Sequence, residues 1–239
     1  MKRNNYQPMV KVKIVDGIEV RHLQYPDARI EVLYKKDGAV LPKVPLKGHY
    51  VDQYISFMLL DKDLRNVISW CAMIKDITDS LDKEKNFQDP DINKNILIKS
   101  LFVSMITIYG KCFTEAKGRR FKLERKIIPD EYKELHDGFM NTRHNFTAHK
   151  GDFKYDTGQM NLLLPGKKRK MHCHIFSELQ QVNFMGNDND LERAIILCEH
   201  LRTTLSDKRN QLLSKIYEEK IHTKDVKYWL SRNGKTTEI

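Results

Sequence analysis

The sequence predicts a mainly α protein, a helical bundle that opens with a small antiparallel β-sheet and carries an inserted β-hairpin. Apolar residues alternate near the N-terminus, recur every three or four residues from Tyr50 onward, and lose that helical period between 153 and 184. These changes of period predict three parts. Residues 1–46 form an N-terminal β appendage, residues 47–222 form the bundle with its β insertion, and residues 223–239 form a polar C-terminal tail.

The first strands are predicted by strict alternation and by turn residues. Val10, Val12 and Ile14 alternate with lysines, and Asp16-Gly17 is a strong signal for a two-residue hairpin turn. Two prolines and a glycine between residues 42 and 48 then end the strand pattern. We therefore expect an antiparallel sheet followed by a domain boundary near residue 46.

Two amphipathic helices are expected next, because two separate apolar stripes follow Tyr50. The first stripe is Val51, Tyr54, Ile55, Met58 and Leu59; the second is Leu64, Val67, Ile68, Cys71, Ile74, Ile77 and Leu81. Asp89 and Pro90 suit the start of a third helix, which runs to about residue 115. This helix is apolar on most sides, which predicts a central place in the bundle.

Pro129, followed by two acidic residues, predicts the start of a further helix, because proline and early carboxylates both suit a helix N-terminus. Short strands around the turn Pro165-Gly166 predict the inserted hairpin. Asn187 or Asp188 then caps a long helix whose apolar residues repeat at three, four and seven.

Composition points to a folded protein of reducing compartments. The chain has 239 residues, 40% of them hydrophobic, and its four cysteines lack CxxC spacing, as reduced core thiols do. No export signal or membrane span is evident, so we expect a cytoplasmic protein without a membrane partner. The formal net charge of +10 favours polyanionic partners.

Arg143 is the most unusual residue of the chain. It lies four residues after Phe139 and three before Phe146, on the apolar face of its helix, so it points toward the core. A guanidinium keeps its proton when water is removed and must find carboxylate, phosphate or carbonyl partners. Asn145 and His149 follow at the same helix end. His136 shares a face with Arg143 and is interpreted as a satisfied core histidine.

At these residues the sequence resembles the HEPN superfamily, whose signature is an arginine and a histidine separated by four to six residues. Arg143, five residues and His149 match that signature. The family commonly has Asn or Asp directly after the arginine, whereas here His144 holds that position and Asn145 follows. The resemblance extends to the preceding apolar helix and the long C-terminal helix, and it implies a HEPN-like up-and-down helical bundle.

The resemblance also implies an activity. Catalytic HEPN proteins cleave RNA without metal at a composite site between two bundles, so the implied form is a homodimer that needs no cofactor. By resemblance, Arg143 stabilises phosphate charge, His149 transfers protons, and Asn145 or His144 positions the RNA. Bacterial defence or toxin roles follow from the family, with an antitoxin or defence-system protein as a further partner.

Two basic runs are candidates for RNA contact. The run from Lys117 to Lys126 joins the apolar helix to the motif helix, whereas Lys167 to Lys170 is interpreted as a solvated hairpin tip. The residues expected to bind RNA phosphates are Arg119, Arg120, Lys122 and Lys150.

Two alternatives remain open. Many bundles of this superfamily are non-catalytic, so an interaction or RNA-binding module is the alternative to an endoribonuclease. In His172-Cys173-His174 the two histidines are alternate residues that share one face of a strand, so they could hold zinc, but no second ligand pair has matching spacing. We therefore expect no metal site.

Overall fold

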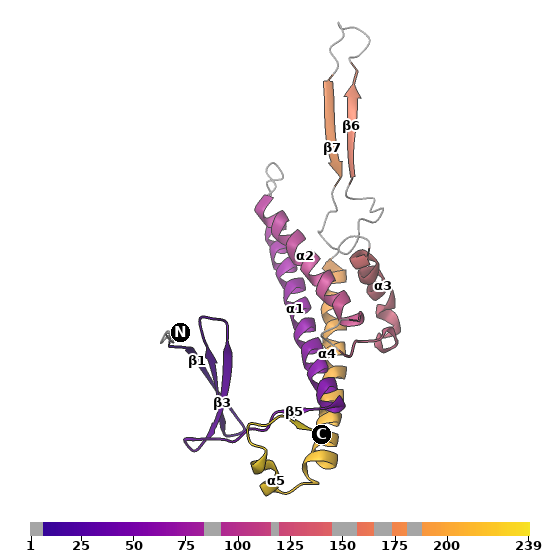
Figure 1. Cartoon of the computed structure of the whole chain (residues 1–239). Coiled ribbons are helices and arrows are strands. Elements are labelled where there is room, and N and C mark those ends of the chain that lie inside the picture. Colours follow the sequence, from indigo (N-terminus) through magenta and orange to yellow (C-terminus); the bar gives the residue numbers. More distant parts are fainter. Residues whose placement is uncertain (1–6, 84–91, 116–119, 145–156, 165–173, 181–187) are drawn as a thin grey trace. The chain divides into compact units, whose positions relative to one another are not determined.

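The computed structural model describes residues 7–83, 92–115, 120–144, 157–164, 174–180 and 188–239 (Figure 1). The chain divides into two compact units. One unit comprises Met1–Gly48 together with Lys215–Ile239, and the other comprises His49–Ser214. The predicted mainly α class with a small N-terminal antiparallel sheet is confirmed.

The N-terminal sheet contains four antiparallel strands in the order β1-β2-β3-β4. They are β1 (Met9–Val15), β2 (Ile18–Gln24), β3 (Ile30–Lys36) and β4 (Ala39–Val40). The Asp16-Gly17 turn has φ angles of 51° and 74°, and Asp37-Gly38 has 51° and 80°. Two successive positive φ angles match the twist of hairpin strands, and aspartate and glycine tolerate them. The predicted hairpin is therefore confirmed.

The C-terminal residues belong to the same unit as this sheet. After a π-helical turn, η4 (Tyr217–Ile221), they form α5 (Val226–Ser231) and β8 (Thr237–Glu238), which pairs in parallel with β5 (Leu46–Lys47). The sequence pattern predicts a separate polar tail at residues 223–239. In the structure these residues instead belong to the unit that contains the N-terminal sheet. The reason is backbone pairing, which hydropathy does not reveal: the N–H of Ile239 donates to the carbonyl of Lys47 at 2.9 Å.

Helix α1 (His49–Lys83) is a single helix of 35 residues, so the prediction of two helices was wrong. The buried stripe runs through Phe57, Leu60, Leu64, Val67, Cys71 and Ile74, whereas Ile55, Met58 and Leu59 of the first predicted stripe are exposed. The polar interruption at residues 61–63 contains no proline or glycine, and its acids are ion-paired. The helix therefore continues through it.

The remaining long helices complete the second unit. They are α2 (Ile92–Phe113), α3 (Lys133–Thr142) and α4 (Asp188–Ile216). Two short turns, η1 (Arg125–Ile127) and η2 (Asp130–Tyr132), precede α3, and α2 packs against both α1 and α3 (Figure 1). Among the described helices, α2 alone is long and apolar enough to cross a bilayer, a property that core helices of globular bundles share.

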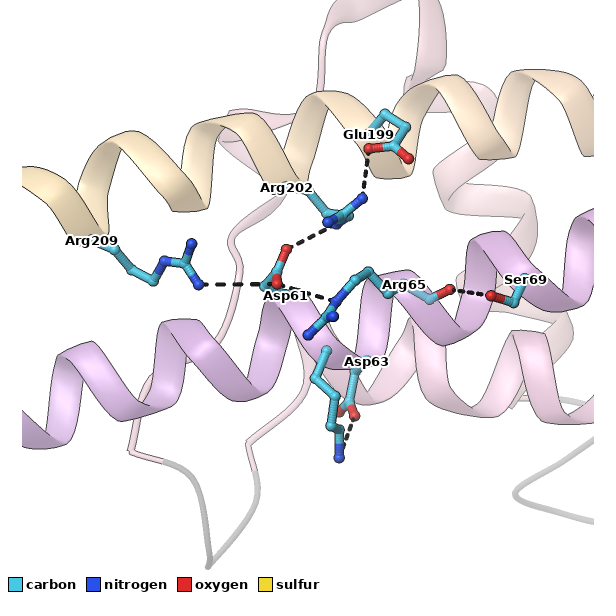
Figure 2. A network of polar contacts seen from close by, with 8 residues as sticks. Asp61, Asp63, Arg65, Ser69, Glu199, Arg202 and Arg209 are labelled. Atoms are coloured by element: carbon cyan, nitrogen blue, oxygen red, sulfur yellow. Dashed lines mark hydrogen bonds and ion pairs between the residues drawn. The ribbon is translucent and has the colours of Figure 1, made fainter. Parts of the chain in front are cut away.

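Ion pairs join α1 to α4 around one carboxylate. Figure 2 shows Asp61 of α1 pointing toward arginines of α4. Its Oδ1 accepts from Nε of Arg202 at 2.8 Å, and its Oδ2 lies 3.3 Å from Arg65 and 4.0 Å from Arg209. Arg202 also donates to Glu199 at 2.8 Å. Asp61 is only 13% exposed, so these pairs are partly shielded from water and from salt.

A second carboxylate of α1 is almost fully buried. The Asp63 side chain is 2% exposed and lies 3.6 Å from Lys111 of α2 and 3.3 Å from Lys62. A buried carboxylate requires such partners, because desolvation of an unpaired charge is costly. The acids that interrupt the apolar pattern of α1 therefore connect it to both neighbouring helices.

The inserted hairpin is present and is antiparallel, as predicted. It consists of β6 (Thr157–Leu163) and β7 (His174–Gln180), with Leu162 opposite Ile175 and Met160 opposite Ser177.

Candidate functional site

Arg143 lies at the C-terminal end of α3, where its backbone N–H bonds the carbonyls of Phe139 and Met140. Its half-buried side chain passes over α2 at Gly110. A Cβ built on Gly110 would stand 1.9 Å from Cδ and 2.8 Å from Nε of Arg143. The absent side chain at Gly110 is therefore what lets the arginine stem lie on α2. The inward orientation predicted for Arg143 agrees with this contact.

A buried polar pair lies beside this contact. Tyr109, the neighbour of Gly110 on α2, shares a hydrogen bond of 2.8 Å between its hydroxyl and Nδ1 of His136 on α3. Both side chains are buried, with exposures of 0% and 3%, and the rings of Phe113 and Phe139 surround them. The interpretation of His136 as a satisfied core histidine is confirmed.

Burial sets the protonation of this pair. It lowers the pKa of His136 below its ordinary value, an effect that the Asp137 carboxylate opposes and Arg125 reinforces. Burial also raises the pKa of the Tyr109 hydroxyl well above its ordinary value. Both groups therefore stay neutral near pH 7, and the pair contributes packing and a hydrogen bond rather than charge.

The structure describes only the beginning of the motif. Arg143 is half-buried and His144 is exposed, and the two continue the helical backbone of α3. Asn145, His149 and Lys150 lie outside the described residues. The meeting of Arg143 with His149 therefore stays a prediction from the sequence.

The described basic side chains of the segment before α3 are all ion-paired with carboxylates. The pairs are Arg120 with Asp52 at 2.6 Å, Lys122 with Glu115 at 3.1 Å, Arg125 with Asp137 at 2.6 Å, and Lys126 with Glu124 at 2.5 Å. The cationic partners are between 41% and 77% exposed, so each pair contributes little to stability. In such an exposed pair the cation can exchange its carboxylate partner for a phosphate group. Arg119 lies outside the described residues.

No cluster of three or more histidine, cysteine or acidic side chains that would suit a metal ion occurs in the described parts of the chain. His172 and Cys173 lie outside them. Cys71, Cys112 and Cys198 are buried free thiols, and burial raises the pKa of Cys71 to about 12. These three cysteines accordingly behave as apolar core residues.

Gly110 and Tyr109 are the residues of this site that the sequence analysis did not assign. An isolated glycine within an apolar helix is a weak signal, because it indicates close approach without naming the partner. The partner, Arg143, lies 33 positions later in the chain. Only tertiary packing connects the two.

Comparisons of the chain with protein-family models, with curated proteins and with solved structures found no match.

Proposed function

We propose that this protein is a metal-independent endoribonuclease of HEPN type, acting as a homodimer in the cytoplasm in a bacterial defence or toxin role. The observation that carries the proposal is the placement of Arg143. A guanidinium is fixed at the end of α3 by the contact of its stem with Gly110, in a chain of net charge +10. A cation held in place stabilises developing negative charge without reorganising during the reaction.

The proposed reaction is attack by a ribose 2'-oxygen on the adjacent phosphorus. The P–O bond to the 5'-oxygen of the next nucleotide breaks, which leaves a 2',3'-cyclic phosphate and a free 5'-hydroxyl. Arg143 donates paired N–H groups to the phosphate oxygens. His149 transfers a proton at the 2'- or the 5'-oxygen, and Asn145 or His144 positions the strand. The reaction needs no metal ion or organic cofactor.

RNA binding is proposed to extend along the segment before α3. Arg120 and Lys122 are exposed, and their present carboxylate partners are exchangeable for RNA phosphates. Arg119 and Lys150 are assigned the same role from their positions in the sequence. Binding to phosphates through these residues has a steep dependence on salt concentration.

The second candidate function is a non-catalytic interaction or RNA-binding module. It is favoured by the way the stem of Arg143 packs on a core helix, because an arginine with a purely structural role packs in the same way. In that case the substitution of Arg143 reduces stability, and wild-type protein cleaves no RNA.

The test compares wild type, Arg143→Ala and Arg193→Ala on a pool of unstructured RNA in chelator at neutral pH. Arg193 is the matched control, because it is also a partly buried arginine of this unit, paired with Asp190 and the carbonyl of Glu131. We expect Arg143→Ala to abolish cleavage and to keep its helical circular dichroism, while Arg193→Ala cleaves normally.

Mixed dimers test the composite site. Co-expressing Arg143→Ala with His149→Ala restores part of the activity if each catalytic unit takes one residue from each chain. If both residues act within one chain, every unit is broken and the mixture stays inactive. If wild type does not cleave RNA and each single substitution lowers the stability of the protein, both residues have a structural role.

A further inference from the structure

We propose that one face of the N-terminal β-sheet binds single-stranded RNA. The strand register defines this face, because residues directly opposite each other in an antiparallel sheet point to the same side. Its other strand residues are apolar apart from one glutamine, Gln24. The polar and aromatic side chains of this lysine face, all exposed, are Lys11, Lys13, His22, Tyr34 and Lys36.

The charges of the sheet are segregated by face. The strand residues of the lysine face include no acid, and both acids of the strands, Glu19 and Glu31, lie on the opposite face with Arg21 and Lys35. There Arg21 is ion-paired with Glu19. The hydrogen bond from Arg21 lowers the pKa of the Glu19 carboxyl, and the charge of Lys35 acts in the same direction. Positive and negative side chains therefore balance on the opposite face, whereas the lysine face is purely cationic.

The three lysines of this face are available to an anionic partner. In the described parts of the chain, the ion pairs near the sheet join Arg21 to Glu19 and Arg29 to Asp27, and none involves these lysines. Two of them lie two positions apart on β1, which separates them by roughly 7 Å along the strand. A partner with regularly repeated negative charges, such as a phosphate backbone, neutralises both and releases its own counterions.

Tyr34 adds a stacking surface among these lysines. Its side chain is 39% exposed and lies in one row with Lys13, across Val20 of β2. His22 is its diagonal neighbour on β2. Exposed rings on a β-sheet stack on unpaired bases, while cations beside them hold the backbone. The arrangement fits a single strand, because the bases of a duplex stack on one another and leave no ring face free.

An open pocket of about 280 Å³ adjoins Tyr34. Val32 and Tyr34 line it together with Leu41, Lys43 and Asn233. Nζ of Lys43 donates to the carbonyl of Val32 at 3.1 Å, and the backbone N–H of Lys43 donates to Oδ1 of Asn233 at 3.1 Å. These bonds hold the walls in place. Apolar walls with a few fixed polar groups are typical of small-ligand sites, and a base turned out of the strand is a ligand of that kind.

Two other anionic partners fit the lysine face less well. Basic clusters that hold proteins on anionic membranes generally contain about four to eight lysines or arginines, more than the three lysines present here. An acidic protein would be attracted by the lysines, but it gives no role to the exposed ring of Tyr34 or to the pocket beside it. Single-stranded RNA uses all three features.

This inference deepens the proposed function, on which it rests for the choice of RNA rather than DNA. The lysine face belongs to the unit that contains the sheet, whereas Arg120 and Lys122 belong to the other unit. It therefore adds a second contact surface for the substrate, and it requires that the RNA contain unpaired bases.

The experiment measures binding of an unstructured 2'-O-methyl RNA to the full chain by fluorescence anisotropy at several salt concentrations. This probe lacks the attacking hydroxyl and stays intact whether or not the protein is a nuclease. The test variant combines Lys11→Gln with Lys13→Gln. The matched control combines Arg21→Gln with Lys35→Gln, which removes the same charge from the opposite face.

We expect the test variant to bind more weakly and to lower the slope of log K against log salt by about 1.4 in magnitude, the value for two phosphate contacts with a single strand. The control is expected to keep the wild-type slope. Equal effects of the two variants, or a wild-type slope for the test variant, would overturn the proposal.

Tyr34 is tested by two substitutions of different character. Tyr34→Ala is expected to raise the dissociation constant about tenfold, because it removes one stacked base contact, whereas Tyr34→Phe keeps the ring and binds as wild type does. Photo-cross-linking of wild type to the same probe carrying 4-thiouridine keeps the test independent of how the variants fold. Cross-links are expected in β1, β2 and β3. Cross-links confined to the other unit contradict the proposal.

Two further measurements separate this inference from its alternatives. If vesicles containing phosphatidylserine bind wild type but not the test variant, while both bind the RNA probe equally, the face is a membrane contact and the proposal is wrong. Cleavage of unmodified RNA distinguishes the proposed function. A protein that binds the probe through the lysine face and cuts no RNA supports the inference and rejects the nuclease, whereas a nuclease whose probe binding ignores the lysine face rejects the inference alone.

Discussion

The stem of Arg143 lies against the backbone of Gly110 so closely that a Cβ at position 110 would stand 1.9 Å from the arginine Cδ. One residue comes from the C-terminal end of α3 and the other from the last turn of α2. The contact fixes the path of the arginine side chain. A methyl group added at position 110 of α2 is therefore expected to displace the Arg143 side chain while residue 143 itself stays an arginine.

Gly110→Ala is expected to displace Arg143 and to lower RNA cleavage about a hundredfold, the usual effect of losing one charge-stabilising donor. The control is Gly138→Ala on α3, where an added Cβ meets nothing within 4 Å. That control should retain activity and gain up to about 1 kcal/mol of stability, because alanine favours helices over glycine. Full activity of Gly110→Ala would show that the position of the arginine stem is unimportant.

His136 predicts a pH dependence of stability. Burial lowers its pKa in the folded state, so the unfolded chain binds a proton more readily. The contribution of neutral His136 is complete above the unfolded pKa of about 6.5 and is lost as the pH falls from there through the folded value. Urea unfolding at pH 7.5 and 5.5 measures the loss.

The matched variant is His136→Gln, which keeps a polar partner for the Tyr109 hydroxyl and does not titrate. We expect its stability to change less between these two pH values than that of wild type. A pH dependence identical to that of wild type would assign the effect to other groups.

Asp61→Asn is expected to destabilise the bundle by about 1 to 3 kcal/mol, less than the loss of one partner from a fully buried ion pair. The substitution removes the shared counterion of Arg65, Arg202 and Arg209, which join α1 and α4 (Figure 2). Glu124→Gln removes the acid of an exposed pair with Lys126 and should change stability far less, because solvent screens such pairs. Urea unfolding followed by helical circular dichroism compares them, and equal effects would contradict the structural role of Asp61.

Arg120→Ala combined with Lys122→Ala is expected to weaken RNA binding and to flatten its salt dependence. If both residues contact phosphates of a single strand, the slope of log K against log salt falls in magnitude by about 1.4. The control is Arg29→Ala, which removes an exposed arginine of the N-terminal unit that is ion-paired with Asp27. Fluorescence anisotropy at several salt concentrations gives the slopes, and an unchanged slope would remove these two residues from the RNA surface.

The fold was predictable from sequence where local chemistry determines it. Asp16-Gly17 fixes a hairpin turn by its own backbone preferences, and the alternation of Val10, Val12 and Ile14 marks a strand. Helix α1 shows where this reasoning fails. Its buried stripe continues through Asp61 and Asp63, whose charges are compensated by α4 and α2, and a one-dimensional pattern contains no such information.

The candidate site was predictable to the same extent. Helical spacing alone predicts that Arg143 points toward the core and that His136 lies on the same face of the helix. Gly110 and Tyr109 come from a different helix, so no local period connects them with the motif. The role of the C-terminal residues was hidden for a similar reason, because β8 pairs with β5 through backbone groups.

The most direct test of the account is the end chemistry of RNA cut in chelator. Wild type is expected to produce 2',3'-cyclic phosphate and 5'-hydroxyl ends, to leave DNA of the same sequence intact, and to lose this activity on Arg143→Ala but not on Arg193→Ala. An Arg143→Ala variant that cuts as well as wild type, or a wild type that cuts no RNA, would contradict the assignment of Arg143 to catalysis.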